Sequence, residues 1–86
     1  MSRKDKLLLK LLMGNADNNF DLNDLVQILD RLDFEERQTG GSHRIFSKIG
    51  IVGIINLQNT KDGKAKPYQV KQVRDFIVTN KLMNDE

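Results

Sequence analysis

The sequence predicts an α+β domain in which helices pack on one face of a three-stranded antiparallel sheet, in the order α-α-β-β-β-α. Three observations lead to this prediction. Apolar residues recur at helical spacing toward both ends of the chain, and three short runs between residues 34 and 58 have the character of strands. The breaks between these runs are short and contain glycine, which is typical of an antiparallel meander.

The first helix is expected at residues 3–13. Ser2 and Asp5 have the spacing of a capping box, and four leucines follow on one helical face. These leucines are Leu7, Leu8, Leu11 and Leu12. Gly14 and the turn "NADNN" end the helix. We expect this helix to serve as part of the core or as an oligomer contact rather than as a membrane element.

A second helix is expected from Asp21 to about Asp33. Asp21 has the character of an N-cap residue, and Asp24 in the first turn suits the positive end of a helix. Phe20 and Leu25 have the spacing of a hydrophobic staple. The apolar stripe consists of Leu22, Leu25, Val26, Leu29 and Leu32.

The three strand-like runs are "FEERQT", "SHRIFSK" and "IVGIINLQ", which begin at residues 34, 42 and 51. The segment "NTKDGKA" is a polar loop, and Pro67 opens the first turn of a last helix. That helix carries its apolar stripe at Val70, Val73, Phe76 and Ile77.

Side-chain alternation in the middle strand places Arg44 and Phe46 on one face and His43, Ile45 and Ser47 on the other. Phe46 is the largest apolar side chain of this strand and the best candidate to face the helices. We therefore expect His43 to point toward the uncovered face of the sheet.

Length and composition limit the possible functions. A chain of 86 residues forms a single domain, and with 38% hydrophobic residues it has enough apolar surface to fold alone. The absence of cysteine excludes disulfides, thiolate metal sites and cysteine nucleophiles. The run at residues 7–13 is too short to cross a bilayer. We expect a soluble, unprocessed, cytoplasmic protein with no membrane association and no cofactor.

Charge is distributed unevenly along the chain. Residues 15–36 carry seven acidic side chains and one basic one, whereas residues 37–74 carry eight basic side chains and one acidic one. The bases of the second segment are Arg37, Arg44, Lys48, Lys61, Lys64, Lys66, Lys71 and Arg74. Such a basic half is compatible with a polyanionic partner, and equally with an ordinary solvated surface.

The single histidine, His43, has two interpretations: a surface residue beside a turn, or a general acid–base group that works near neutral pH. One histidine without cysteine is a poor metal-ligand set, and Ser42 adjoins His43 in a strand and so points away from it. Basic residues lie before and within the last helix, around a helix N-terminus that attracts anions. They are Lys64, Lys66, Lys71 and Arg74. Tyr68 there either stacks on a base or packs half-buried.

These parts together resemble the HicA family of mRNA interferase toxins. The resemblance covers about residues 21–78 and rests on "DLVQILDRLDFEER", "GGSHRIF", "GIVGIINLQ" and "KAKPYQVKQVRDFI". Its most specific part is the tripeptide Gly41-Ser42-His43, followed by Phe46. Two features depart from the family pattern: Arg44 stands where many members have a second histidine, and the helix at residues 3–13 is an addition.

The resemblance implies a fold like that of double-stranded-RNA-binding domains, with residues 1–20 as an extra helix and turn and residues 21–82 as the core. It also implies a metal-independent endoribonuclease, the toxin of a type II toxin–antitoxin pair, in which His43 is catalytic. Arg44, Lys48, Lys64, Lys66, Lys71 and Arg74 are the expected RNA-binding residues. The expected partners are mRNA and a HicB-like antitoxin, and the free chain is compatible with a monomer. A non-catalytic RNA-binding module and a protein-interaction domain remain the alternatives.

Overall fold

Helices and strands follow one another in the predicted order in the computed structural model, which describes residues 3–38 and 41–82. The elements are α1 (Arg3–Met13), a short 3-10 helix η1 (Asp17–Asn19), α2 (Leu22–Arg31), β1 (Glu35–Gln38), β2 (His43–Ser47), β3 (Ile55–Gln58) and α3 (Pro67–Thr79). The α+β class and the order α-α-β-β-β-α are thus confirmed, and η1 is an addition to them. The proposed Ser2–Asp5 capping box lies outside the side chains that the structure describes.

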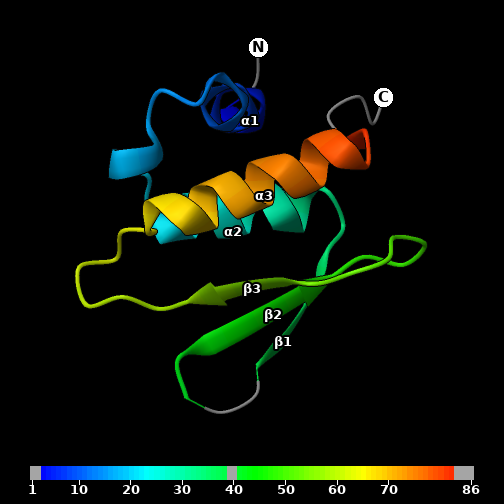
Figure 1. Ribbon diagram of the computed structural model, residues 1–86. Coiled ribbons are helices and arrows are strands. Elements are labelled where there is room, and N and C mark those ends of the chain that lie inside the picture. Colours follow the sequence, from blue (N-terminus) through cyan, green and yellow to red (C-terminus); the bar gives the residue numbers. More distant parts are fainter. Residues whose placement is uncertain (1–2, 39–40, 83–86) are drawn as a thin grey trace.

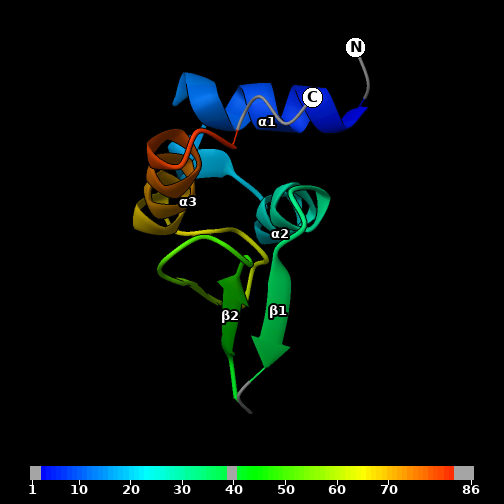
Figure 2. The ribbon, with the colours of Figure 1, turned by 90° about the vertical axis from the view of Figure 1, so that its right-hand side faces the viewer.

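The domain has three layers, with the sheet at the bottom of Figures 1 and 2. Helices α2 and α3 lie over one face of the sheet, and α1 crosses above both of them on the side away from the sheet. The opposite face of the sheet carries no helix among the described residues. All three helices therefore lie on one side, as predicted, but α1 forms a second helical layer.

The core is continuous through these layers. Its buried apolar side chains are Leu11, Phe20, Leu22, Leu25, Ile28, Leu29, Leu32, Phe34, Phe46, Ile55, Leu57, Ala65, Val70, Val73 and Ile77. Leu11 is fully buried, and the other three leucines of the predicted stripe pack against this cluster. Helix α1 thus completes the core.

Helix α2 begins where the sequence indicates, with Asp21 in an extended conformation at the N-cap. The Asp21 carboxylate makes no capping hydrogen bond and instead accepts one from Lys64 Nζ at 2.7 Å. The helix ends in a left-handed residue, Asp33 (φ 68°), and the Phe34 N–H donates back to the Leu29 carbonyl at 3.0 Å. This C-terminal motif satisfies a free carbonyl and turns the chain into β1.

The sheet is antiparallel with the strand order β1-β2-β3. Strand β3 begins at Ile55, four residues later than its apolar run suggests, because Gly53 adopts φ 108° and the Ile51 N–H bonds the Lys48 carbonyl in a turn. The connection at residues 48–54 therefore lies outside the ladder. Three of its apolar side chains, Ile49, Val52 and Ile54, are exposed.

Candidate functional site around His43

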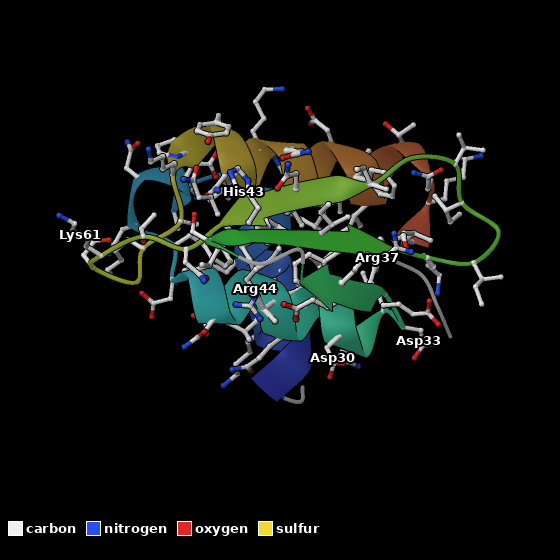
Figure 3. The ribbon with its side chains drawn as sticks, turned by 90° about the horizontal axis from the view of Figure 1, so that it is seen from below. Asp30, Asp33, Arg37, His43, Arg44 and Lys61 are labelled. Atoms are coloured by element: carbon white, nitrogen blue, oxygen red, sulfur yellow. The ribbon has the colours of Figure 1, made fainter. Side chains whose placement is uncertain are left out.

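His43 opens strand β2 at one end of the sheet, where it pairs with Gln58 of β3. Its side chain is exposed, whereas Phe46 of the same strand is buried against the helices. Figure 3 shows this open face, with His43 and Lys61 toward one end of the sheet and Arg37 toward the other. The predicted placement of His43 on the uncovered face is confirmed.

The imidazole of His43 is oriented by a neighbour on β3. Its Nδ1 lies 3.3 Å from Asn56 Oδ1. An amide oxygen only accepts, so with the Asn56 amide in this orientation the ring proton lies on Nδ1. Nε2 then carries the free lone pair. This is the arrangement in which a neighbouring group fixes the tautomer of a histidine and leaves the other nitrogen available as a base.

A pocket of about 220 Å³ lies beside His43, at the sheet edge formed by β3, next to the first turns of α3. The lining residues are His43, Asn56, Gln58, Tyr68, Gln69 and Gln72. Four of these six carry amide side chains, which are neutral and offer both donors and acceptors. The site therefore combines one proton-transfer group with a set of uncharged hydrogen-bonding groups.

Gln69 is a buried polar side chain in this wall, with 1% of its surface exposed. Its Oε1 accepts a hydrogen bond from the Lys66 N–H at 3.0 Å. Because a backbone N–H only donates, this bond settles which end of the amide is oxygen. No described residue accepts a hydrogen bond from the Nε2 of Gln69, and this nitrogen is not fully removed from solvent.

The two residues before His43 shape the start of the strand. Gly41 adopts φ 87°, which favours glycine, in the turn that leads into β2. The Ser42 carbonyl accepts the Asn59 N–H at 3.0 Å, and Ser42 Oγ lies 3.5 Å from Gln58 Nε2. The residues of the tripeptide thus fix the local backbone and one pocket amide, and the hydrogen bonds of Ser42 go to Asn59 and Gln58 rather than to the imidazole.

Four pocket residues were not singled out by the sequence analysis: Asn56, Gln58, Gln69 and Gln72. A signal for them exists once the strand pairing is known, because Asn56 and Gln58 alternate onto the face of His43. The two glutamines of α3 lie three residues apart and so share a side of the helix. Neither signal identifies a site until three separate elements are brought together.

Arg44 does not lie beside His43. It points to the opposite face of the sheet, where its guanidinium binds Glu36 through Nε at 2.6 Å and Nη2 at 2.9 Å. The hydrogen bond to Glu36 raises the pKa of Arg44, and partial burial opposes this effect. In the structure Arg44 links β1 to β2.

Three further cations of the predicted RNA-binding set are occupied within the chain. Lys48, five residues along from His43 and so about 16 Å away, donates to the Leu32 carbonyl at 2.6 Å. Arg74 forms a double hydrogen bond with Asp17 at 2.8 and 2.9 Å. Lys71 pairs with Asp75 one helical turn along α3, at 2.7 Å.

Lys64 and Lys66 lie in the segment between β3 and α3, at the His43 end of the sheet. Lys64 binds Asp21, and this hydrogen bond raises the pKa of Lys64 and lowers that of Asp21. Lys66 is exposed, and none of the acidic side chains that the structure describes pairs with it. Of the six predicted cations, Lys66 is therefore the one that the described residues leave available near the pocket.

These pairs change the meaning of the uneven charge distribution. The acidic segment at residues 15–36 supplies Asp17, Asp21 and Glu36, and the basic segment at residues 37–74 supplies their partners. The two segments therefore neutralise each other in part, so that the basic half seen in the sequence is a smaller basic surface in three dimensions.

The N-terminus of α3 offers few donors to an anion. Pro67 has no N–H, and the N–H groups of Gln69 and Val70 both donate to the Lys66 carbonyl, at 2.9 and 3.2 Å. The helix start therefore contributes mainly its dipole and the Lys66 ammonium.

Other kinds of site find little support in residues 3–38 and 41–82. Among the side chains that the structure describes, no group of three or more potential ligands stands close enough to hold a metal ion, and no described helix is long and apolar enough to cross a membrane. A further hollow of about 80 Å³ between α1 and α2 is bordered mainly by apolar side chains such as Leu7, Leu8 and Ile28. It contains no counterpart of His43.

Comparison with known proteins returned no match: no family model matches the chain, and no curated protein or solved structure is significantly similar to it.

Proposed function

We propose that the chain is a metal-independent endoribonuclease of the HicA toxin type, with His43 as its general acid–base group. The observation that carries the proposal is the setting of His43. It is an exposed imidazole whose Nδ1 is held by Asn56 and whose Nε2 is free, at the rim of a polar pocket. A general base needs a positioned lone pair within reach of the proton that it removes.

In the proposed reaction, His43 Nε2 takes the proton of a ribose 2′-hydroxyl while the 2′-oxygen forms a bond to the adjacent phosphorus. The bond from phosphorus to the 5′-oxygen of the next nucleotide breaks, this oxygen takes up a proton from water, and His43 later returns its proton to the solvent. The products are a 2′,3′-cyclic phosphate and a 5′-hydroxyl end. Acid–base assistance of this kind contributes roughly 100- to 10,000-fold to the rate.

Stabilisation of the phosphate charge falls mainly to Lys66, which stands at the start of α3 beside the pocket. Lys64 adds a second positive charge in the same segment, although it is shared with Asp21. Arg37, on the open face of the sheet, has no ion-pair partner among the described residues and adds a contact for a longer RNA. Cations placed where charge develops are a general device of phosphoryl chemistry.

A non-catalytic RNA-binding module is the second candidate. The observation that favours it is the composition of the pocket, because four of the five residues that accompany His43 are amides, which neither give nor take a proton. Both candidates predict an affinity for RNA that falls steeply as the salt concentration rises.

The two candidates differ in the role of His43. Purified protein is incubated with single-stranded RNA in the presence of EDTA, and His43→Ala is compared with wild type after its folding has been checked by thermal melting. We expect wild type to cut the RNA and His43→Ala to leave it intact. Equal cleavage by both proteins, or RNA left intact by wild type, removes the enzyme proposal.

A toxin of this type needs an inhibitor, and the proposal includes a HicB-like antitoxin that covers His43. The apolar side chains of the connection at residues 48–54 offer such a partner a surface, since Ile49 and Val52 are 86% and 95% exposed. In bacteria, wild type should arrest growth, His43→Ala should not, and co-expression of the adjacent open reading frame should restore growth. Well-folded wild-type protein without effect on growth contradicts the toxin assignment.

A further inference from the structure

The pocket beside His43 is better suited to a neutral polar ring than to a phosphate. Its lining contains four amides and a tyrosine, and no lysine or arginine. Phosphates in proteins are normally met by Arg, Lys or backbone N–H groups, whereas base edges are read by neutral donor–acceptor pairs such as those of Asn and Gln. The lining is therefore typical of a base-reading site.

Gln69 supplies the strongest single reason to expect a ligand in this pocket. Its side chain is almost completely buried, and its Oε1 is taken by the Lys66 N–H. Buried polar groups are nearly always hydrogen-bonded, to protein, water or ligand. The Nε2 of Gln69 therefore has a donor to offer in the pocket, and its orientation does not depend on a choice between two amide rotamers.

Two neighbouring amides have partly assigned roles. Asn56 Oδ1 is engaged by His43, which leaves Asn56 Nδ2 as a second donor. Gln58 Nε2 is directed to Ser42 Oγ, which leaves Gln58 Oε1 as an acceptor. Asn56, Gln58 and Gln69 thus present two donors and one acceptor, and Gln72 lines the same pocket with a further amide.

Tyr68 supplies the remaining requirement of a base site, which is a flat surface for stacking. Its side chain is 60% exposed on the pocket rim, so its ring is largely uncovered by the protein itself. Single-stranded RNA bases are commonly held by stacking on an aromatic side chain while their edges are hydrogen-bonded. The exposure of Tyr68 argues against half-buried packing and leaves its ring accessible for stacking.

We propose that this pocket binds a pyrimidine base of single-stranded RNA, with uracil as the probe, stacked on Tyr68 and hydrogen-bonded by Asn56, Gln58 and Gln69. The pairing edge of a pyrimidine presents two acceptors and one donor, which complements the two donors and one acceptor of these three amides. The pairing edge of adenine presents one ring-nitrogen acceptor beside one amino donor, so one of the two donors stays unpaired. The inference rests on the proposed function only in that His43, on the pocket rim, would then act on the ribose of the bound nucleotide.

The experiment is a titration of the full chain with uridine 3′-monophosphate and, separately, adenosine 3′-monophosphate, followed by NMR of the side-chain amides and the Tyr68 ring. We expect saturable shifts of the Gln69 and Asn56 amides with the uridine nucleotide, and at least about tenfold weaker binding of the adenosine nucleotide. Equal binding of the two nucleotides, or shifts confined to other parts of the chain, overturns the proposal.

Two variants separate the contributions. Gln69→Glu keeps an oxygen for the Lys66 N–H but replaces the Nε2 donor by an acceptor, so it should abolish the preference for the uridine nucleotide over the adenosine nucleotide. Gln27→Glu is the matched control, because Gln27 is an exposed residue of α2, and it should preserve this preference. Tyr68→Leu should weaken the binding of both nucleotides to a similar extent, because every base has a face that stacks. If the preference for the uridine nucleotide survives Gln69→Glu, Gln69 does not distinguish the two bases.

These outcomes are distinguishable from a failure of the proposed function. If RNA cleavage requires His43 but the nucleotides cause no shifts in the pocket, the ribonuclease proposal stands and the pyrimidine site is removed. If uridine 3′-monophosphate causes selective shifts in a chain that cuts no RNA, the pyrimidine site stands and the RNA-binding module is supported instead.

Discussion

The ion pair between Arg74 and Asp17 provides the sharpest test of the distinction between structural and RNA-binding cations. Arg74 lies on α3 and holds both η1 and the end of α1, through two hydrogen bonds to Asp17 and one to the Leu11 carbonyl at 3.3 Å. The perturbation is Arg74→Met, which keeps most of the apolar stem and removes the charge. We expect a loss of stability without a specific loss of RNA binding.

The magnitude follows from the geometry and the exposure. Hydrogen bonds to charged groups contribute about 1.5–3 kcal/mol when well buried, and exposed ion pairs contribute about 0–1 kcal/mol. The side chains of Arg74 and Asp17 are 19% and 25% exposed, so we expect a coupling free energy between them of about 1.5 kcal/mol. For a domain of this size, the loss of that free energy in Arg74→Met lowers the melting temperature by roughly 6–12 °C.

The assay is a double-mutant cycle of Arg74→Met and Asp17→Asn, measured by thermal and urea unfolding. Lys71→Met is the matched control, because its ion pair with Asp75 on the same helix is largely exposed and should contribute less than about 0.5 kcal/mol. A coupling free energy below about 0.5 kcal/mol for Arg74 and Asp17 refutes the structural role.

The same pair predicts a pH dependence. The hydrogen bond from Arg74 lowers the pKa of Asp17 below its ordinary value of 3.8, although burial opposes the shift. The unfolded chain therefore binds more protons than the native one near that pH, and the stability from this pair increases with pH. It is fully present above about pH 5 and is lost as the pH falls through the lowered native pKa. A stability difference between wild type and Asp17→Asn that stays constant from neutral pH to pH 2 contradicts this assignment.

Three further predictions concern the frame of the site. Gly53→Ala should destabilise the fold by about 1–3 kcal/mol, because φ is 108° and a Cβ would lie 3.3 Å from Phe76. Gly50→Ala should lower the stability less, because a Cβ at Gly50, where φ is 89°, meets open space. Denaturant unfolding of the two variants measures the difference. Phe46→Ala should cost about 3–5 kcal/mol by the same measurement, since Phe46 is 2% exposed, and a much smaller loss would mean that the sheet repacks. The Lys48 ammonium binds a carbonyl at the end of α2, so Lys48→Met should lower the stability by about 1 kcal/mol. The same variant should bind RNA with unchanged affinity in a filter-binding assay. A loss of RNA affinity without a loss of stability would restore the RNA-binding role of Lys48.

Local patterns predicted most of the fold. The leucine stripe of α1, the start of α2 at Asp21 and the proline at the start of α3 are properties of short segments, and each was placed correctly. Alternation along β2 was sufficient to put His43 and Phe46 on opposite faces. The start of β3 was misplaced because an apolar run looks like a strand until the left-handed conformation of Gly53 interrupts the pairing.

The site was less accessible to sequence reasoning because its members meet through long-range contacts. Asn56 and Gln69 come from a strand and a helix that only the folded chain brings to His43. The charges were misleading for the same reason: Lys64 binds Asp21, 43 residues away, and this distance in sequence hides the pairing. Periodicity identifies which face a residue occupies, but not which residue lies opposite.

The layer formed by α1 has a practical consequence for experiments on this chain. It lies on the side of α2 and α3 away from the sheet (Figure 1). Exposed positions on its outer surface, such as Leu9 and Met13, are therefore remote from the open face that carries His43. A fluorescent dye or a linker to a sensor chip attached there through an engineered cysteine would leave the imidazole unobstructed, and the lack of any native cysteine makes such labelling specific to one position.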